Sequence, residues 1–367
     1  MIVIYSATVL LILLYLAYPL FLLLSSSGKS GIERGKESDK VNNVTLILLS
    51  YNGKDFLQEK IDFLIKELSH FQHHEMIIVD DNSTDGSKEL LADIKGNNDI
   101  LIISKTAHKG IPDSMNIGVK HAKYDYVVFC DQRQKLSGNI LQRIVEPLKY
   151  NNVGAVSGRI SHLGAENRYS FIRRHENYLK SGESRTGNLI GVYGPFYAIK
   201  KSTYCIIPDD IILDDLYLSL RILKSKHIEL RENCMITDED ISFLYDYKRT
   251  RRYLSGFIQI LKEDTIISDL DNKQKVMLIW HKYLRLLIPV FLFMCYVNAG
   301  LLILDGIEYL IFFIILTTIG LMSLLPCKFR FQFLLKSLIR INIYYFIALA
   351  DILIQDILMK KVANKFR

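Results

Sequence analysis

Two adjacent carboxylates stand at the end of an apolar run in this sequence. Residues 76–79 are apolar, and Asp80 and Asp81 follow them directly, before a loop of small polar residues. In an open α/β sheet the ligand crevice lies beyond the carboxyl ends of the strands, so carboxylates at that point could bind the base and ribose of a nucleotide. The alternative is an acidic turn in which Ser83 or Asp85 caps the following helix.

Further carboxylates occupy comparable places later in the chain. Asp131 directly follows the apolar residues 127–130. It could ligate a Mg²⁺ or Mn²⁺ ion that diphosphate oxygens also bind, because such ions take hard oxygen ligands; alternatively, it caps a helix. Asp214 and Asp215 precede Leu216 at an expected helix start. A carboxylate there can act as a general base, although paired acids at a helix N-terminus are also favourable with the helix dipole.

A group of basic and aromatic residues lies in a later helical segment. Arg249, Arg252 and Tyr253 have the i, i+3, i+4 spacing that places side chains on one helical face. Guanidinium groups bind phosphate bidentately and can stabilise the charge that develops on a diphosphate leaving group. Attraction to anionic lipid is the alternative, and we favour it for Arg251. Residues 191–198, with glycines three apart, would allow a sugar to approach the backbone closely.

The order of the surrounding segments predicts the scaffold that positions these residues. We expect strands at 44–49, 76–79, 100–104 and 126–130, with helices at 55–69, 87–95 and 111–122 between them. This alternation predicts an α/β fold with a mostly parallel sheet and right-handed connections. The strand ends would then gather Tyr51, Asp80, Asp81 and Asp131 at one edge of the sheet. Farther along, we expect strands at 153–159, 191–199, 228–230 and 234–237 and helices at 213–223 and 246–261.

The composition and the N-terminus indicate a membrane protein. The chain has 367 residues, 50% of them hydrophobic, which is too apolar for an ordinary soluble protein. Residues 1–24 contain no charged side chain and are long enough to span a bilayer. Basic residues follow this run instead of preceding it; they are Lys29, Arg34, Lys36 and Lys40. This order favours an uncleaved span with the N-terminus outside and the next domain in the cytoplasm.

The C-terminal hundred residues also have the composition of a membrane region. Residues 284–304 and 307–325 are candidates for spanning helices. Residues 341–359 are apolar but contain Asp351 and Asp356, so they could form a third span, a re-entrant segment or an interfacial helix. Because the basic tail that follows argues for a cytoplasmic end, we favour a segment that does not cross.

Several other functional classes find no support in the sequence. The five cysteines are scattered without a C-x-x-C pair, which fits reduced thiols and gives no metal-site spacing. No nucleic-acid-binding signature is present, and the basic excess lies largely beside apolar segments. We interpret His70, His73 and His74 as surface residues, despite their helical metal-ligand spacing.

Taken in order, the motifs resemble family 2 glycosyltransferases. They are Ser50-Tyr51-Asn52, the Val79–Asp85 stretch, Asn116-x-Gly118, Asp131, Asp214-Asp215 and Arg249-x-x-Arg252-Tyr253. The similarity is greater to the membrane-integrated processive branch, which includes cellulose, chitin and hyaluronan synthases. It covers roughly residues 44–304, and the Tyr-Asn and Asp-Asp-Asn-Ser-Thr-Asp-Gly stretches are its most specific parts.

The resemblance implies a GT-A fold, that of nucleotide-diphospho-sugar transferases, and inverting transfer from a nucleoside-diphosphate sugar, with a UDP-sugar favoured. A Mg²⁺ or Mn²⁺ cofactor would be bound at Asp131, and Asp215 would be the catalytic base. The residues implied at the nucleotide sugar are Tyr51, Asn52, Asp80, Asp81, Asp131 and Arg133. The residues implied at the diphosphate and acceptor are Asp214, Arg249, Arg252 and Tyr253.

The sequence also departs from the family pattern. Arg133 replaces the second acid of the metal motif, which leaves Asp131 alone and puts metal dependence in doubt. The family's Gln-x-x-Arg-Trp has become Arg-x-x-Arg-Tyr, which keeps phosphate binding but alters acceptor stacking. Ile111 stands where the family has a lysine, and Lys109 is a candidate substitute. The C-terminal apolar segments are fewer than a large translocating channel usually has.

These observations divide the chain and give one expected activity. The expected parts are an N-terminal transmembrane helix at 1–25, a linker at 26–43, a cytoplasmic GT-A domain at 44–245, an amphipathic interface helix at 246–265, a C-terminal membrane region at 281–359 and a basic tail at 360–367. We expect transfer of a sugar to a membrane-associated glycan acceptor, in polysaccharide or lipid-linked glycan synthesis at the plasma membrane. The alternatives are addition of one sugar to a polyprenyl-linked acceptor, or a non-catalytic nucleotide-sugar-binding component of a membrane assembly.

Overall fold

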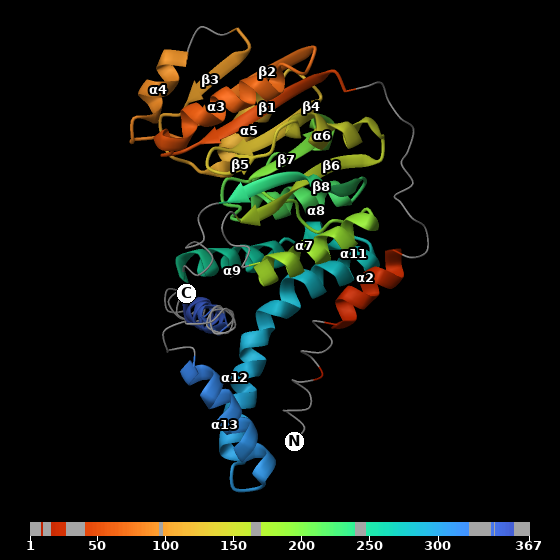
Figure 1. The fold of residues 1–367 in the computed structure, drawn as a ribbon, viewed down its shortest axis with the longest axis vertical. Coiled ribbons are helices and arrows are strands. Elements are labelled where there is room, and N and C mark those ends of the chain that lie inside the picture. Colours follow the sequence, from red (N-terminus) through yellow and green to blue (C-terminus); the bar gives the residue numbers. More distant parts are fainter. Residues whose placement is uncertain are drawn as a thin grey trace, which may run out of the picture.

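The computed structural model describes residues 9, 16–26, 41–94, 98–162, 170–238, 247–322, 339–340 and 342–355. Most of the expected N-terminal span and linker, the 360–367 tail and Asp356 lie outside the described residues. The described residues form an α/β domain above a layer of helices, and two apolar helices extend below that layer (Figure 1).

The described strands form one sheet in the order β3-β2-β1-β4-β7-β6-β8-β5. The strands are β1 (Asn43–Ser50), β2 (His73–Asp80), β3 (Ile100–Ser104), β4 (Tyr126–Asp131), β5 (Lys135–Leu136), β6 (Val153–His162), β7 (Phe196–Lys200) and β8 (His227–Asp238). The first four strands along this order are parallel, as the alternation predicted. β7 is antiparallel to both β4 and β6, so the sheet changes direction at its centre.

The parallel strands are continuous apolar runs because the sheet is covered on both faces. In β2, residues 76–79 are fully buried. The register sets Ser50 beside Asp80, Leu49 beside Asp131 and Asp80 beside Ser104. The carboxyl ends of β1 to β4 therefore lie at one edge, which places the loops after all four strands together.

The helices that follow these strands were largely expected from the sequence. The helices of the domain are α3 (Lys54–Leu68), α4 (Ser87–Ile94), α5 (Ile111–His121), α6 (Ile140–Val145), α7 (Ser170–Arg185) and α8 (Asp214–Leu223). The first three and α8 agree with the prediction to within a residue or two. Helices α6 and α7 were missed, because α6 is short and α7 carries too few apolar residues for a clear period.

Two strand predictions need correction. The strand expected at 191–199 begins only at Phe196. Gly191 has a positive φ of 90°, and the N–H groups of Val192 and Tyr193 donate to the hydroxyls of Ser219 and Ser157 instead of to a neighbouring strand. The two short strands expected at 228–230 and 234–237 are one strand, β8, whose pairing with β6 contains register shifts.

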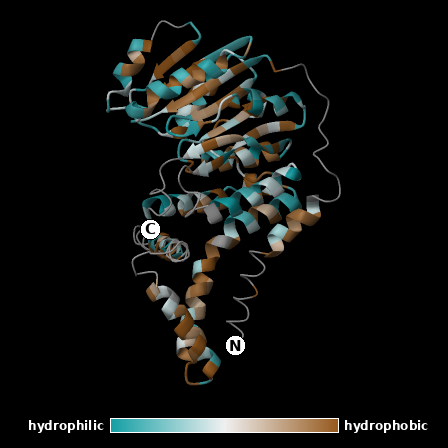
Figure 2. Ribbon diagram, viewed as in Figure 1, coloured by the Kyte–Doolittle hydropathy of each residue, from teal (hydrophilic) through white to brown (hydrophobic). Residues whose placement is uncertain are grey.

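A helical layer separates the sheet from the apolar helices below. It contains α2 (Tyr18–Ser26), α7, α9 (Tyr247–Lys262) and α11 (Asn272–Leu278) (Figure 1). The π-helical turn η5 (Ile279–Leu284) follows α11 and leads into α12 (Arg285–Leu301), and α13 (Ile307–Met322) follows a short turn. Figure 2 shows α12 and α13 as mostly hydrophobic along their length.

The described residues give limited support to the expected membrane spans. Within them, no helix by itself combines the length and apolar character needed to cross a bilayer. The pair Asn272–Leu284 and Leu286–Leu301, bent by 50°, meets that requirement together. Helices Ile307–Met322 and Asn342–Gln355 are apolar but shorter. The predicted 284–304 span therefore corresponds to the lower limb of a bent helix.

Candidate active site

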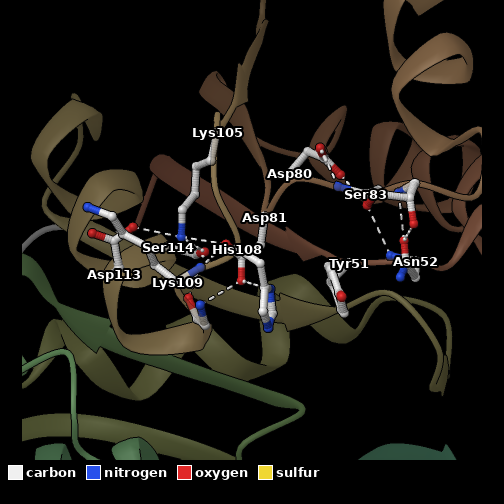
Figure 3. A network of polar contacts seen from close by, with 12 residues as sticks. Tyr51, Asn52, Asp80, Asp81, Ser83, Lys105, His108, Lys109, Asp113 and Ser114 are labelled. Atoms are coloured by element: carbon white, nitrogen blue, oxygen red, sulfur yellow. Dashed lines mark hydrogen bonds and ion pairs between the residues drawn. The ribbon is translucent and has the colours of Figure 1, made fainter.

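Asp80 and Asp81 point in opposite directions from the end of β2 (Figure 3). Asp80 is fully buried and accepts hydrogen bonds from the N–H and the hydroxyl of Ser83. It fixes the turn after β2 and does not face the open edge. Asp81 turns instead toward the loop after β3 and is 5% exposed.

Asp81 is the centre of a dense polar network. Its carboxylate accepts the N–H groups of Lys109 and Gly110 at 2.9 and 2.7 Å, and it lies 2.6 Å from Lys105 Nζ. Burial alone would raise the pKa of Asp81, but the hydrogen bonds from these three residues outweigh it and hold the pKa below its usual value. Lys105 also lies 2.6 Å from Asp113, so one buried ammonium joins two carboxylates.

Two aromatic rings stand beside this network at the exposed side of the edge. The rings of Tyr51 and His108 stack with centroids 4.1 Å apart, and His108 Nδ1 lies 2.8 Å from Asp81 (Figure 3). Asn52 adopts a positive φ of 45°, accepts the N–H of Thr84 and donates its own N–H to Ser83. The contacts of Asn52 thus hold the ends of β1 and β2 together. The stacked rings of Tyr51 and His108 are available to a planar base.

The end of β4 contributes one candidate ligand and one supporting residue. Asp131 is half-buried, and its N–H donates to the carbonyl of Pro195 at 2.9 Å, which ties β4 to the loop before β7. The buried Gln132 accepts from the Ser50 hydroxyl and donates to the Tyr51 carbonyl. Arg133, which stands in the second acidic place of the family motif, is exposed.

The N-terminus of α8 brings a pair of carboxylates to the same edge. Burial, followed by the charges of Asp215 and Asp131, raises the pKa of Asp214 to about 8, against an opposing effect of Arg252. Asp215 accepts the N–H of Leu216, and a methyl group added to Gly194 would lie 3.3 Å from its Oδ2 atom. Asp215 therefore faces the 191–195 loop, while Asp214 interacts with Asp131 and Arg252.

Helix α9 supplies the basic side of the site. Arg249 donates to the Tyr253 hydroxyl at 3.1 Å, and Arg252 lies 6.0 Å from the centre of the same ring. Gly256, one turn later, lets α9 pack closely against Leu213, directly before the Asp214–Asp215 pair. The helix start of α8 and the arginines of α9 are thus positioned by one contact.

Arg251 contacts another part of the protein. Its Nε atom lies 3.8 Å from Asp351, and its Nη2 atom donates to Gln355 at 2.7 Å. Asp351 also accepts the Tyr247 hydroxyl at 2.6 Å. These contacts give Asp351 a structural reason to stand within an apolar segment, and they join the 342–355 helix to α9.

Sequence reasoning missed three residues that shape the site, namely Lys105, Gln132 and His108. Lys105 directly follows the third strand, and a lone lysine at the carboxyl end of a parallel strand was the signal that could have found it. Gln132 was visible only as the neighbour of Asp131, and His108 carried no signal by itself.

Asn116 belonged to a recognised motif, but its role is structural: it accepts from the Tyr204 hydroxyl and exchanges two hydrogen bonds with Ile207. The side chain of Lys109, the proposed substitute for the family's lysine, is exposed and only its N–H contacts Asp81.

The donor set at Asp131 fits a metal ion that is bound mainly by its substrate. Among the described residues, no three His, Cys, Asp or Glu side chains are arranged to hold a metal by themselves. Asp131 stands at a strand end within electrostatic reach of Asp214, and Arg133 supplies no oxygen. Mg²⁺ and Mn²⁺ sites that use one or two carboxylates plus substrate phosphates need no more protein ligands than this.

Comparison with known proteins identifies the class of this fold. A mannosyltransferase from Pyrobaculum calidifontis, solved in complex with GDP-Man and Mn²⁺, superposes with a TM-score of 0.71 at 18% sequence identity, covering 94% of this chain and 99% of that one. The domain therefore has a GT-A-like α/β fold with a mostly parallel sheet, as predicted.

Sequence comparison identifies the family. The model of glycosyl transferase family 2 matches residues 45–205. Poly-beta-1,6-N-acetyl-D-glucosamine synthase of Staphylococcus aureus (strain MSSA476) is 25% identical over 242 residues, a match that covers 62% of this chain and 57% of that protein. The protein of the same name from Staphylococcus epidermidis is 22% identical over 289 residues, covering 74% and 68%. Residues 45–205 thus form a family 2 glycosyltransferase domain, which confirms the resemblance seen in the motifs. The matched region is little more than half the length of the S. aureus relative.

Proposed function

We propose that this protein is an inverting glycosyltransferase that moves a sugar from a nucleoside-diphosphate sugar to a membrane-associated glycan acceptor. One observation carries the proposal: Asp214, the neighbour of Asp215, lies within electrostatic reach of both Asp131 and Arg252. A base, a candidate metal ligand and a phosphate-binding cation are therefore close enough to act on one diphosphate sugar.

The nucleotide would bind at the ends of β1 and β2. Tyr51 and His108 offer stacked rings to the base, and Asp81, oriented by Lys105 and the backbone of the 109–110 turn, lies beside them. Asp80 would act indirectly, through the turn that it fixes with Ser83. Asn52 would hold this turn against the end of β1.

The transfer step would take place between Asp131 and Asp215. Asp215 would remove the proton from an acceptor hydroxyl, whose oxygen attacks the anomeric carbon as the bond to the diphosphate breaks. Arg249 and Arg252 would stabilise the charge that develops on the leaving diphosphate, and Tyr253 would border the acceptor. A divalent ion bound at Asp131 would supply further charge neutralisation on the diphosphate. Asp214, whose raised pKa keeps it largely protonated at neutral pH, would sit beside the diphosphate with little charge repulsion.

The acceptor would approach along a membrane surface. We assign the N-terminal apolar run, α12 and α13 to the bilayer, with the catalytic domain on its cytoplasmic side. The support is the apolar character of α12 and α13 below the helical layer and the exposed apolar side chains they carry, such as Phe293 and Ile314. Polysaccharide synthesis is the favoured setting, because the S. aureus and S. epidermidis relatives are named for a β-1,6-linked N-acetylglucosamine polymer.

The test is release of nucleoside diphosphate by the detergent-solubilised full chain, with UDP- and GDP-sugars, Mg²⁺ or Mn²⁺, and membrane lipid extract as acceptor. UDP-N-acetylglucosamine is the first donor to assay. Asp215→Asn should lower kcat by about 10²–10⁴-fold while donor binding is retained. Asp209→Asn, an exposed acid on the loop before α8, is the matched control.

Other results of this assay would favour one of the alternatives or contradict the nucleotide site. Turnover that stops after one sugar would favour the single-addition alternative over a processive enzyme. Donor binding without turnover in the wild type would favour the non-catalytic alternative. Absence of binding to every donor would contradict the nucleotide site itself.

A further inference from the structure

Helix α7 carries a buried lysine that none of the motifs includes. Lys180 is 3% exposed, and its Nζ atom donates to the carbonyls of Gly191 and Val192, the second at 3.5 Å. The same ammonium lies 4.2 Å from the centre of the Tyr193 ring. One side chain therefore holds three consecutive residues of the loop that precedes Gly194.

This loop is connected by hydrogen bonds to the start of α8. The N–H of Val192 donates to Ser219 Oγ at 3.1 Å, and Ser219 Oγ donates to the carbonyl of Asp215 at 2.6 Å. A continuous chain of contacts thus runs from Lys180 through Val192 and Ser219 to Asp215. Gly194 lies two residues farther along the loop, and a Cβ atom built on it would be 3.3 Å from Asp215 Oδ2.

A second residue of α7 anchors the loop at its other end. Glu183 is fully buried and accepts the N–H of Ile190 at 3.1 Å. It also accepts the Tyr18 hydroxyl from α2 and lies 2.6 Å from His281 Nδ1 in η5. The helix that holds the loop is itself held by both elements that border the apolar helices.

Burying an amine at this position costs free energy, which indicates that its hydrogen bonds have a role in the structure. Burial, together with the charge of Lys282, lowers the pKa of Lys180 to about 7. Glu176, Glu183 and Asp215 act in the opposite direction. A methionine would fill the same space without this penalty, so packing alone does not explain a lysine here.

We propose that Lys180 is a positioning residue for the acceptor side of the site. It fixes the 191–194 loop against α8, so that Asp215 faces the place where an acceptor hydroxyl binds. This inference depends on the proposed function, because it concerns the acceptor of that reaction.

The test compares Lys180→Met with the wild-type full chain in detergent. The donor Kd is measured by titration with the sugar nucleotide that the wild type uses, and kcat is measured against increasing membrane lipid extract. We expect the half-saturating amount of extract to rise by about tenfold or more, with a lower kcat and a donor Kd within about twofold of wild type. Lys180→Gln, which keeps an NH₂ group that can donate hydrogen bonds, should recover part of the loss.

Two further variants keep the test decisive if Lys180→Met is poorly folded. Ser219→Ala removes only a hydroxyl from the same chain of contacts and should shift the acceptor response in the same direction. Lys201→Met is the matched control, because Lys201 donates to the carbonyl of Ala122 away from this loop. Equal changes in donor Kd and acceptor response, no change in either, or an equal effect of Lys201→Met would overturn the inference. Failure of the wild type to turn over any donor would reject the proposed function itself, which is a different result.

Discussion

The imidazole ring of His108 stacks on the phenol ring of Tyr51, with an interplanar angle of 23° and 4.1 Å between the centroids. His108 is also 2.8 Å from the carboxylate of Asp81, so its orientation is fixed from two directions. Both rings remain substantially exposed. The pair can therefore offer a preorganised flat surface to a nucleotide base.

Replacement of His108 by alanine should weaken donor binding. We expect Kd for the nucleoside diphosphate to rise by about tenfold, since loss of one aromatic stacking partner of a base typically costs about 1–3 kcal/mol. Isothermal titration calorimetry with UDP and GDP measures this effect. His121→Ala is the control, because His121 is exposed at the end of α5 and its Nδ1 atom lies 2.9 Å from the Ile117 carbonyl oxygen of the same helix. An unchanged Kd for His108→Ala would remove this ring from the nucleotide site.

Lys105→Met should destabilise the domain. The change removes one ammonium from between Asp81 and Asp113 and leaves two poorly solvated carboxylates close together. Breaking a buried pair by removal of one partner costs about 3–5 kcal/mol, and thermal or denaturant unfolding measures the loss. Lys123→Met tests the specificity of the effect, because Lys123 pairs with Glu75 at 3.6 Å from a 71% exposed side chain. We expect about 0–1 kcal/mol there; similar losses in both variants would contradict the role given to Lys105.

The local pattern of apolar and polar residues was sufficient to predict the first four strands of the sheet. Continuous apolar runs ending in polar residues define β1 to β4, and a right-handed parallel arrangement then requires Tyr51, Asp81 and Asp131 to share an edge. What the pattern could not distinguish was the orientation of two neighbouring carboxylates. Asp80 and Asp81 are identical, adjacent residues in the sequence. The turn contact of Asp80 with Ser83 and the long-range contact of Asp81 with Lys105 separate their roles.

The second half of the domain was harder to predict from the sequence, because the arrangement of its strands and loops depends on long-range contacts. The 191–195 segment was included in an expected strand, yet the N–H groups of Val192 and Tyr193 bond to Ser219 and Ser157, far away in the sequence. Lys180 lies on a mostly polar helix, where a buried lysine cannot be told from an exposed one. Hydrogen-bond partners of this kind carry no local signal in the sequence.

Asp81 should make stability depend on pH in the acid range. Its pKa is lower in the folded protein than in the unfolded chain, so the unfolded state binds a proton more readily. The stabilisation is complete above the unfolded value of about 4 and is lost as pH falls through the folded pKa. Unfolding temperatures measured from about pH 6 down to about pH 3 should therefore fall less for Asp81→Asn than for wild type. Asp209→Asn should follow the wild-type curve, and parallel curves for all three proteins would contradict the prediction.

Asp214 should make stability depend on pH in the opposite direction from Asp81, and at higher pH. Burial and the neighbouring Asp215 raise its folded pKa to about 8, so the folded state holds a proton that the unfolded chain releases near pH 4. Wild-type stability contributed by this residue is therefore present below about pH 4 and declines as pH rises to about 8. Asp214→Asn mimics the protonated form, so its advantage in unfolding temperature over wild type should grow across this window and then level off. Because Asn keeps the side-chain shape, a constant difference from pH 4 to pH 8 would show that Asp214 is ionised in the folded protein. In that case one more negative charge would stand at the start of α8, and a diphosphate bound there would need a divalent ion at Asp131 and both arginines to offset the repulsion.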